Sequence, residues 1–192
     1  MFRILTIERN EKMKLTETTL KENYIYKGRI INLRKDDVEL PNGKTSIREF
    51  VEHNGGVCVL PLTDDDENIF VRQFRYPYKE ELLEIPAGKR DSKDEIPLEC
   101  GKRELREETG AVAEEYINLG ELYPSPGYVG EIIYMFLAKG LSFGEDDRDE
   151  DEFLNVEKIP FKKALEMVMN GEIKDAKTQT AILKAAVLLG KI

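Results

Sequence analysis

Residues 103–110 read RELREETG and carry three glutamates, Glu104, Glu107 and Glu108, within five consecutive positions. Positions three and four apart share one face of a helix, and like charges there repel by about 0.2–0.5 kcal/mol per pair. Two interpretations of the stretch remain open. The carboxylates form a solvated face together with the two arginines of the same stretch, or they form a site for a cation that neutralises them.

The residues on either side predict a helix from Pro97 to Thr109. Leu98 and Leu105 recur at helical spacing. Pro97 suits the first turn of a helix, and Gly110 suits the left-handed residue that follows the last turn. The acidic cluster therefore lies on the final turns, where the helix dipole disfavours carboxylates as well. A bound cation would compensate for both effects.

The composition is that of a soluble globular protein with one principal domain, since 41% of its 192 residues are hydrophobic and 35% are charged. The formal charge of -9 argues against non-specific binding to nucleic acid or to anionic membranes. No apolar run approaches the ~20 residues of a membrane span. Cys58 and Cys100 are too few for a disulfide framework, and the first residues do not resemble a signal peptide. The expected location is the reducing cytoplasm.

The N-terminal part of the chain has its own pattern. Met13 begins a second plausible chain, so residues 1–12 are expected to be a disordered extension or a mis-assigned start. Residues 13–53 are expected to form an N-terminal β meander. Its residues 22–53 predict two or three strands, with a turn at residues 41–43, Pro-Asn-Gly. Residues 54–192 are expected to form the second, larger domain.

The larger domain begins with a continuous apolar run at residues 55–63, which predicts a buried strand. Residues 69–76 predict a strand that returns from it as the second arm of a hairpin. The remaining elements expected are two strands within 116–141 around a Pro-Ser-Pro-Gly turn, a last strand at 153–159, and helices at 161–171 and 175–190.

Residues 88–111 resemble the signature of the Nudix hydrolases, G-x5-E-x7-R-E-U-x-E-E-x-G-U, where U is an apolar residue. The second half of the signature is complete. The first half departs from it, because six residues rather than five separate Gly88 from Glu95. Either Asp94 takes the first glutamate position in the standard register, or the loop carries a one-residue insertion and Glu95 takes it. The seven-residue spacing from Glu95 to Arg103 favours the insertion.

The resemblance implies a Mg²⁺ site, with Mn²⁺ as an alternative, because such ions prefer hard oxygen ligands. Arg103 would orient the glutamates through charge-assisted hydrogen bonds. The acidic stretch at 145–152 is either a solvated loop or, as the resemblance implies, a lid that carries the general base. The implied catalytic residues are Glu150, Glu108 and Arg103, and the implied metal ligands are the Ala87 carbonyl, Glu104, Glu107, Glu108 and Glu152.

Segments from about residue 17 to residue 190 are also similar to the bacterial ADP-ribose pyrophosphatases. They read VELPNGK, REFVEH, GGVCVLPL, VRQFRYP, EIPAGK, SPG and DAKT. This resemblance implies an α/β/α sandwich around a mixed sheet, with a small N-terminal antiparallel sheet that packs across a homodimer. The implied substrate-binding residues are Arg29 at the adenosine, Arg48 and Arg75 as clamps, Glu84 near the metals, and Pro126.

The implied reaction is Mg²⁺-dependent hydrolysis of ADP-ribose to AMP and ribose 5-phosphate. Two alternatives remain open from the sequence. One is the same chemistry on another nucleoside diphosphate sugar, such as GDP-mannose or ADP-glucose, because the signature does not fix the contacts to base and sugar. The other is a catalytically silent domain that senses ADP-ribose, which the complete set of signature carboxylates disfavours.

Overall fold

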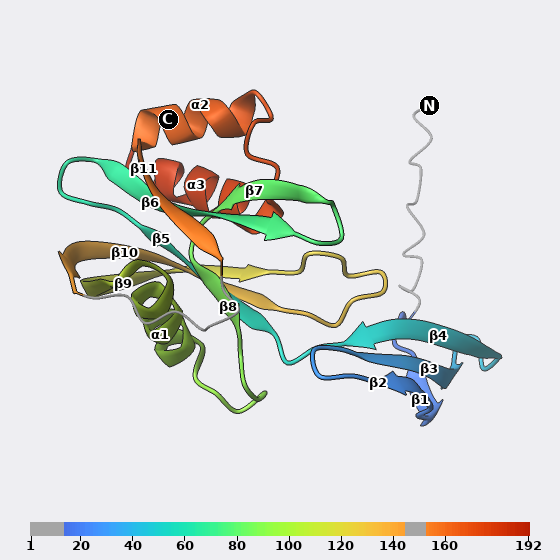
Figure 1. Ribbon diagram of the computed structural model, residues 1–192. Helices are drawn as coiled ribbons and strands as arrows, with labels where there is room; N and C mark the ends of the chain where they lie inside the picture. Colours follow the sequence, from blue (N-terminus) through green and yellow to red (C-terminus); the bar gives the residue numbers. More distant parts are fainter. Residues whose placement is uncertain (1–13, 145–152) are drawn as a thin grey trace, which may run out of the picture. The chain divides into compact units, whose positions relative to one another are not determined.

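The computed structural model describes residues 14–144 and 153–192 (Figure 1). They form two compact units, which divide between Glu52 and His53. The sequence places this boundary one residue further on, between His53 and Asn54. The expectation for residues 1–12 lies outside the described residues.

The N-terminal unit is an antiparallel sheet of β1 (Thr18–Lys21), β2 (Tyr24–Lys27), β3 (Asn32–Glu39) and β4 (Thr45–Glu52). β3 pairs with β4 on one side and with β1 and β2 on the other. Residues 22–53 contain three strands, β2, β3 and β4, within the expected two or three, and β1 precedes this stretch. The side chains of β1 are all exposed, so no alternation of apolar and polar residues marks it.

Two features fix the local structure of this unit. The turn between β3 and β4 forms where the sequence predicts it, and Gly43 there has a φ of 77°, which favours glycine. Within β3, Arg34 and Asp36 are both buried and form an ion pair. The backbone N–H of Asn23 also donates to Asp36 Oδ1, at 3.1 Å. The Asp36 carboxylate is therefore held by a charged and a neutral donor.

The larger unit contains two sheets. In the first, β5 and β10 run parallel while the other neighbours run antiparallel, so the sheet is mixed, as expected. The second sheet is antiparallel throughout. In spatial order the first consists of β8 (Ala87–Lys89), β5 (Gly56–Pro61), β10 (Ile133–Phe143) and β9 (Ala111–Leu122), and the second of β11 (Leu154–Pro160), β6 (Glu67–Arg75) and β7 (Glu80–Glu84).

The hairpin predicted between residues 55–63 and 69–76 was wrong. The two strands form but belong to different sheets, and within the described residues a single isolated bridge, between Leu62 and Asn68, joins them. Pro61 has no N–H to donate to a ladder. Its carbonyl accepts from the buried side-chain amide of Asn68 at 3.2 Å instead of from a backbone N–H of β6. β8 and β10 occupy the two edges of β5, and β6 pairs with β7 and β11 in the other sheet.

Helices cover both faces of the mixed sheet, which gives the expected α/β/α sandwich (Figure 1). β5 is buried along its whole length, and its side chains alternate between the two faces. Val57 and Val59 pack with Cys100 and Leu105 of α1 (Pro97–Thr109). The core on this face therefore anchors the helix that carries the acidic cluster.

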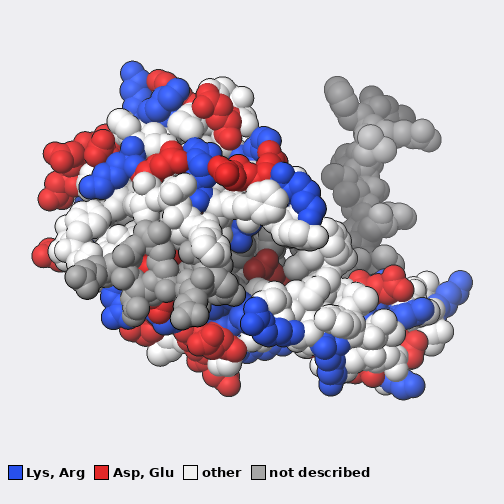
Figure 2. Space-filling model, viewed as in Figure 1, with Lys and Arg blue, Asp and Glu red and all other residues white. Residues whose placement is uncertain are grey.

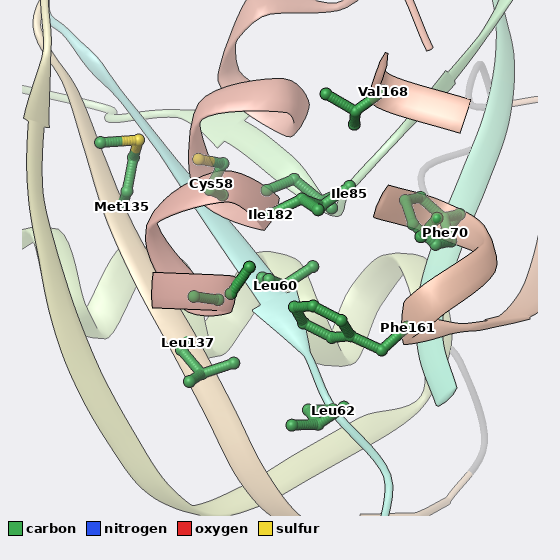
Figure 3. Close-up of a cluster of buried hydrophobic side chains, with 14 of the residues drawn as sticks. Cys58, Leu60, Leu62, Phe70, Ile85, Met135, Leu137, Phe161, Val168 and Ile182 are labelled. Atoms are coloured by element: carbon green, nitrogen blue, oxygen red, sulfur yellow. The ribbon is translucent and has the colours of Figure 1, made fainter. Parts of the chain in front are cut away.

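The opposite face of the sheet packs against α2 (Phe161–Met169) and α3 (Ala176–Leu188), close to where the sequence predicts two helices. Figure 3 shows Leu60 of β5 and Leu137 of β10 in one cluster with Phe161 and Ile182, which come from these helices. Ile85 is fully buried in the same cluster. This core therefore holds the end of β7 and the N-terminal end of α3 close together.

The charged side chains are intermingled on the face shown in Figure 2, where lysines and arginines alternate with aspartates and glutamates. None of the helices in residues 14–144 and 153–192 is long and apolar enough to cross a membrane.

Candidate metal and diphosphate site

The α1 helix has the limits that the sequence predicts. It begins at Pro97 and ends at Thr109, and Gly110 follows in the left-handed region with a φ of 69°. The Gly110 N–H donates to the carbonyl of Arg106 at 2.8 Å, which closes the last turn. Glu104 and Glu108 on this helix are only 8% and 3% exposed. A solvated acidic face therefore does not describe these two carboxylates.

The buried carboxylates face the start of β8. The N–H of Ala87 donates to Glu108 Oε2 at 3.2 Å. Gly88 lies against Glu104, since a Cβ placed at residue 88 would fall 1.9 Å from the Glu104 Cδ. The tertiary structure thus brings together Ala87, Glu104 and Glu108, which the sequence places in one ligand set.

Arg103 is the cation at the centre of this acidic group. Its Nη1 lies 2.8 Å from Glu104 Oε1 and 2.9 Å from Glu107 Oε2, and its Nη2 lies 3.5 Å from Glu95 Oε1. Burial lowers the pKa of the Arg103 guanidinium, but the carboxylates of Glu104 and Glu107 raise the pKa by more. The arginine therefore stays charged and fixes the directions of the glutamates around it.

The loop between Gly88 and α1 distinguishes Glu95 from Asp94. Glu95 accepts the N–H of Asp91 at 2.7 Å in addition to its contact with Arg103. The Asp94 N–H donates to the hydroxyl of Ser92 at 3.3 Å, and the Asp94 residue is exposed. This geometry favours the register in which the loop carries an insertion.

Arg90 holds the same loop and was not singled out by sequence reasoning. The residue is buried, and its guanidinium donates to the carbonyls of Asn54, Lys93 and Glu95 at 3.4, 2.5 and 3.0 Å. An arginine inside a loop gives no local signal of this role, because its carbonyl partners are generic backbone groups. Their convergence is visible only in three dimensions.

A second charged group lies at the end of β7. Arg75 Nε and Nη2 donate to Glu84 Oε1 and Oε2 at 2.6 and 2.7 Å, a bidentate pair with a 1% exposed carboxylate. Lys177 of α3 pairs with the same carboxylate. Burial raises the pKa of Glu84, but the hydrogen bonds of Arg75 and the charge of Lys177 lower the pKa overall. Lys177 was missed as a site residue, although the DAKT segment that contains it was part of the resemblance.

Three further predicted residues, Arg29, Arg48 and Pro126, lie on other segments of the chain. Arg29 is exposed between β2 and β3, and Arg48 on β4 donates from Nε to Glu17 Oε2 at 2.8 Å, both within the N-terminal unit. Pro126 is exposed in the connection between β9 and β10. Glu150 and Glu152 lie outside the described residues.

The chemistry of the donors on α1 fits Mg²⁺. The ion takes hard oxygen ligands, keeps several waters and needs only one or two carboxylates, and two buried carboxylates lie beside the Ala87–Gly88 backbone. Among the described residues, no three His, Cys, Asp or Glu side chains already converge as a metal site. The contact of Glu107 with Arg103 directs that carboxylate to the guanidinium.

Two family profiles match the chain. The NUDIX domain matches residues 52–179, and the nucleoside diphosphate sugar hydrolase N-terminal domain matches residues 17–51. The first match alone covers well over half of the 192 residues. The chain therefore belongs to the Nudix family, and it is a hydrolase of that family.

Three curated relatives show the range of activities among similar chains. An ADP-ribose pyrophosphatase of Bacillus subtilis (strain 168) is 46% identical, with 88% of this chain and 91% of the relative covered. A methanol dehydrogenase activator of Bacillus methanolicus is 42% identical, with 86% and 90% covered. A GDP-mannose pyrophosphatase of Escherichia coli (strain K12) is 33% identical, with 85% and 89% covered.

A solved structure described as an ADP compounds hydrolase has the same fold. The TM-score is 0.79 at 23% sequence identity, and the match covers 93% of this chain and 97% of the other. At this identity the likeness supports the fold alone.

Proposed function

We propose that this hydrolase cleaves the diphosphate of ADP-ribose, giving AMP and ribose 5-phosphate, in a reaction that depends on Mg²⁺, with Mn²⁺ as an alternative. The observation that carries the proposal is the burial of Glu104 and Glu108 against Ala87 and Gly88. Buried carboxylates are costly without positive partners, and Arg103 supplies one positive charge to the cluster. The 46% identity with an ADP-ribose pyrophosphatase supports the choice of substrate.

Each residue has a proposed task in this reaction. When bound, Mg²⁺ would neutralise charge on the phosphoryl oxygens and lower the pKa of the attacking water. Arg103 holds the glutamates in place, as its contacts with Glu104 and Glu107 support. Glu150 is proposed to accept the proton of the water. The proposed metal ligands are the Ala87 carbonyl, Glu104, Glu107, Glu108 and Glu152.

Substrate binding is assigned to three arginines and to Pro126. Arg75 presents a planar guanidinium that suits a diphosphate, and it is held in place by Glu84. Arg48 is proposed as a second clamp, from a partner subunit. Arg29 is proposed to line the adenosine pocket, and Pro126 to border the substrate.

A second candidate is the same chemistry on GDP-mannose or ADP-glucose. The relative described as a GDP-mannose pyrophosphatase, at 33% identity over 85% of this chain, favours it. Both candidates use the proposed metal ligands on α1, and they differ in the contacts to the base and the sugar. Comparing substrates therefore distinguishes the two candidates, whereas variants of the α1 glutamates would affect both reactions.

Assembly and location are also proposals. Exposed apolar residues of the N-terminal sheet, including Leu20, Ile25 and Ile47, support a homodimer formed through this unit. Light scattering on the purified protein would test it, and a monomer at micromolar concentration would contradict it. The two free cysteines, Cys58 and Cys100, are in keeping with a cytoplasmic location.

The function is tested by incubating the protein with ADP-ribose, GDP-mannose and ADP-glucose in parallel, with Mg²⁺, with Mn²⁺ and with a chelator. Products are separated by anion-exchange chromatography. We expect AMP and ribose 5-phosphate from ADP-ribose with the highest kcat/KM, and no product with the chelator. A higher kcat/KM on GDP-mannose would select the second candidate, and the absence of any product with metal would reject both.

A further inference from the structure

Lys177, in the first turn of α3, is a buried lysine that the proposed reaction does not use. The residue is only 8% exposed, and its Nζ pairs with Glu84 and, at 3.0 Å, with Asp175 Oδ1. Burial lowers the pKa of this amine, but Asp175 and Glu84 raise the pKa above its ordinary value overall. A buried ion pair is often no more stable than apolar residues of the same size. Packing alone therefore does not explain a charged lysine here.

The Glu84 carboxylate is shared by two cations. Oε1 accepts from Arg75 Nε, while Oε2 accepts from both Arg75 Nη2 and Lys177 Nζ. The Glu84 carboxylate is thus divided between two cations and does not belong to Arg75 alone. The Arg75 side chain is 37% exposed, so its guanidinium is accessible to a ligand.

We propose that Lys177 is a positioning residue that keeps Arg75 available to an anionic diphosphate by sharing the charge of Glu84. The inference rests on the proposed role of Arg75 as the diphosphate clamp. Without Lys177, Arg75 would be the sole counter-ion of a buried carboxylate. The pair would then be neutral, and its attraction for an anion would fall.

Asp175 is the opposing charge in the same group. It pairs with Lys177, accepts the N–H of Thr178 at 2.9 Å as the N-cap of α3, and contributes to raising the pKa of Arg75. Asn caps helices about as well as Asp. Asp175→Asn therefore removes a negative charge near Arg75 while it keeps the cap, and the proposal requires that diphosphates bind more tightly to this variant.

The experiment measures the Kd of ADP by calorimetry in the presence of a chelator, and the kcat and KM for ADP-ribose with Mg²⁺. Lys177→Met is expected to raise the Kd and KM about tenfold, on the scale of one charge-assisted contact, and to change kcat less than threefold. Lys177→Arg keeps the positive charge and is expected to have the wild-type KM. Asp175→Asn is expected to lower the Kd of ADP by roughly threefold.

Matched variants separate this role from a structural one. Lys174→Met removes an exposed pair with Glu80 of β7, and it is expected to change neither constant. Loss of folding alone would not move the Kd of the folded fraction in opposite directions for Lys177→Met and Asp175→Asn. In an Arg75→Gln background, Lys177→Met is expected to have no further effect on the Kd.

An unchanged Kd of ADP in Lys177→Met, or weaker ADP binding in Asp175→Asn, would overturn the proposal. Fully additive effects of Lys177→Met and Arg75→Gln on the Kd would also overturn it. So would a wild-type protein that does not bind ADP. If the wild type binds ADP but does not hydrolyse ADP-ribose, the proposed function fails, whereas the opposite shifts of Kd would still support the role of Lys177. If the wild type hydrolyses ADP-ribose and Lys177→Met leaves both constants unchanged, only the role of Lys177 fails.

Discussion

Gly88 and Glu104 are in direct contact, because the space that a Cβ at residue 88 would occupy lies 1.9 Å from the Cδ of Glu104. Glu104 cannot easily yield this space, since it is only 8% exposed and its Oε1 lies 2.8 Å from Arg103. The backbone at Gly88 lies outside the left-handed region. Glycine is therefore needed there for space and not for its conformational freedom.

Gly88→Ala is expected to displace the Glu104 carboxylate and to lower kcat by roughly tenfold or more, because a misplaced catalytic group is costly. The melting temperature is expected to fall as well, because the buried side chain of Glu104 has to move. Gly101→Ala is the matched variant on α1, where a Cβ would meet Val57 Cγ2 at 3.0 Å. Overpacking of about 1–3 kcal/mol exceeds the gain in helix propensity of about 1 kcal/mol. Gly101→Ala should therefore melt earlier and keep its kcat, and a Gly88→Ala enzyme with the wild-type kcat would contradict the assignment.

Glu108→Gln is expected to lower kcat by about 100-fold or more, because losing a ligand removes several kcal/mol of charge stabilisation. The fold should remain, since Gln can still accept the N–H of Ala87 that Glu108 Oε2 accepts at 3.2 Å. Activity assays and thermal unfolding of the same preparation check both parts. Glu99→Gln, which alters an exposed pair with Lys102 on the same helix, serves as the control. A fully active Glu108→Gln enzyme would contradict the proposal that α1 binds the metal.

A comparison of the Glu95→Gln and Asp94→Asn variants tests which of the two residues takes the first glutamate position of the signature. Glu95 lies 3.5 Å from Arg103 and caps the N–H of Asp91, whereas Asp94 is exposed. We expect Glu95→Gln to lower kcat/KM by about threefold to tenfold, the scale of a weakened charge-assisted contact, and Asp94→Asn to leave it unchanged. Steady-state kinetics on ADP-ribose would show this, and a larger effect of Asp94→Asn would favour the standard register.

The N-terminal sheet is expected to lose stability in acid through Asp36. Burial raises the pKa of Asp36, but the hydrogen bonds from Arg34 and Asn23 lower the pKa below its ordinary 3.8 overall. A lowered folded-state pKa stabilises the fold above the unfolded pKa, and this contribution is lost as the pH falls through the folded pKa. The free energy of unfolding of the wild-type sheet should therefore exceed that of the Asp36→Asn variant by about 3 kcal/mol at pH 7.

The measurement for Asp36 is urea unfolding followed through the NMR resonances of β3 at a series of pH values. The difference in unfolding free energy between wild type and Asp36→Asn should shrink as the pH falls below 3.8. A gap that stays constant down to pH ~2.5 would show that ionisation of Asp36 does not stabilise the sheet.

Local patterns were sufficient for the parts of the fold that local chemistry controls. Pro97 and Gly110 were enough to set both ends of α1, and the turn at Gly43 formed as predicted. Long-range pairing was harder to predict. β5 and β6 are consecutive strands with a short connection, which usually indicates a hairpin, yet each pairs with strands that come later in the chain. Apolar periodicity shows that a strand is buried but not which strands lie beside it.

The sequence by itself determined the family signature, the helix that carries three glutamates and the apolar strand beneath it, because these depend on residue type and short spacings. Only the tertiary structure decided which charges meet. It placed Gly88 against Glu104, closed the loop around Arg90, and set Lys177 of α3 beside Glu84 of β7, 93 positions apart. Such contacts depend on how two sheets and three helices pack around shared cores, and a charged side chain does not encode its distant partner.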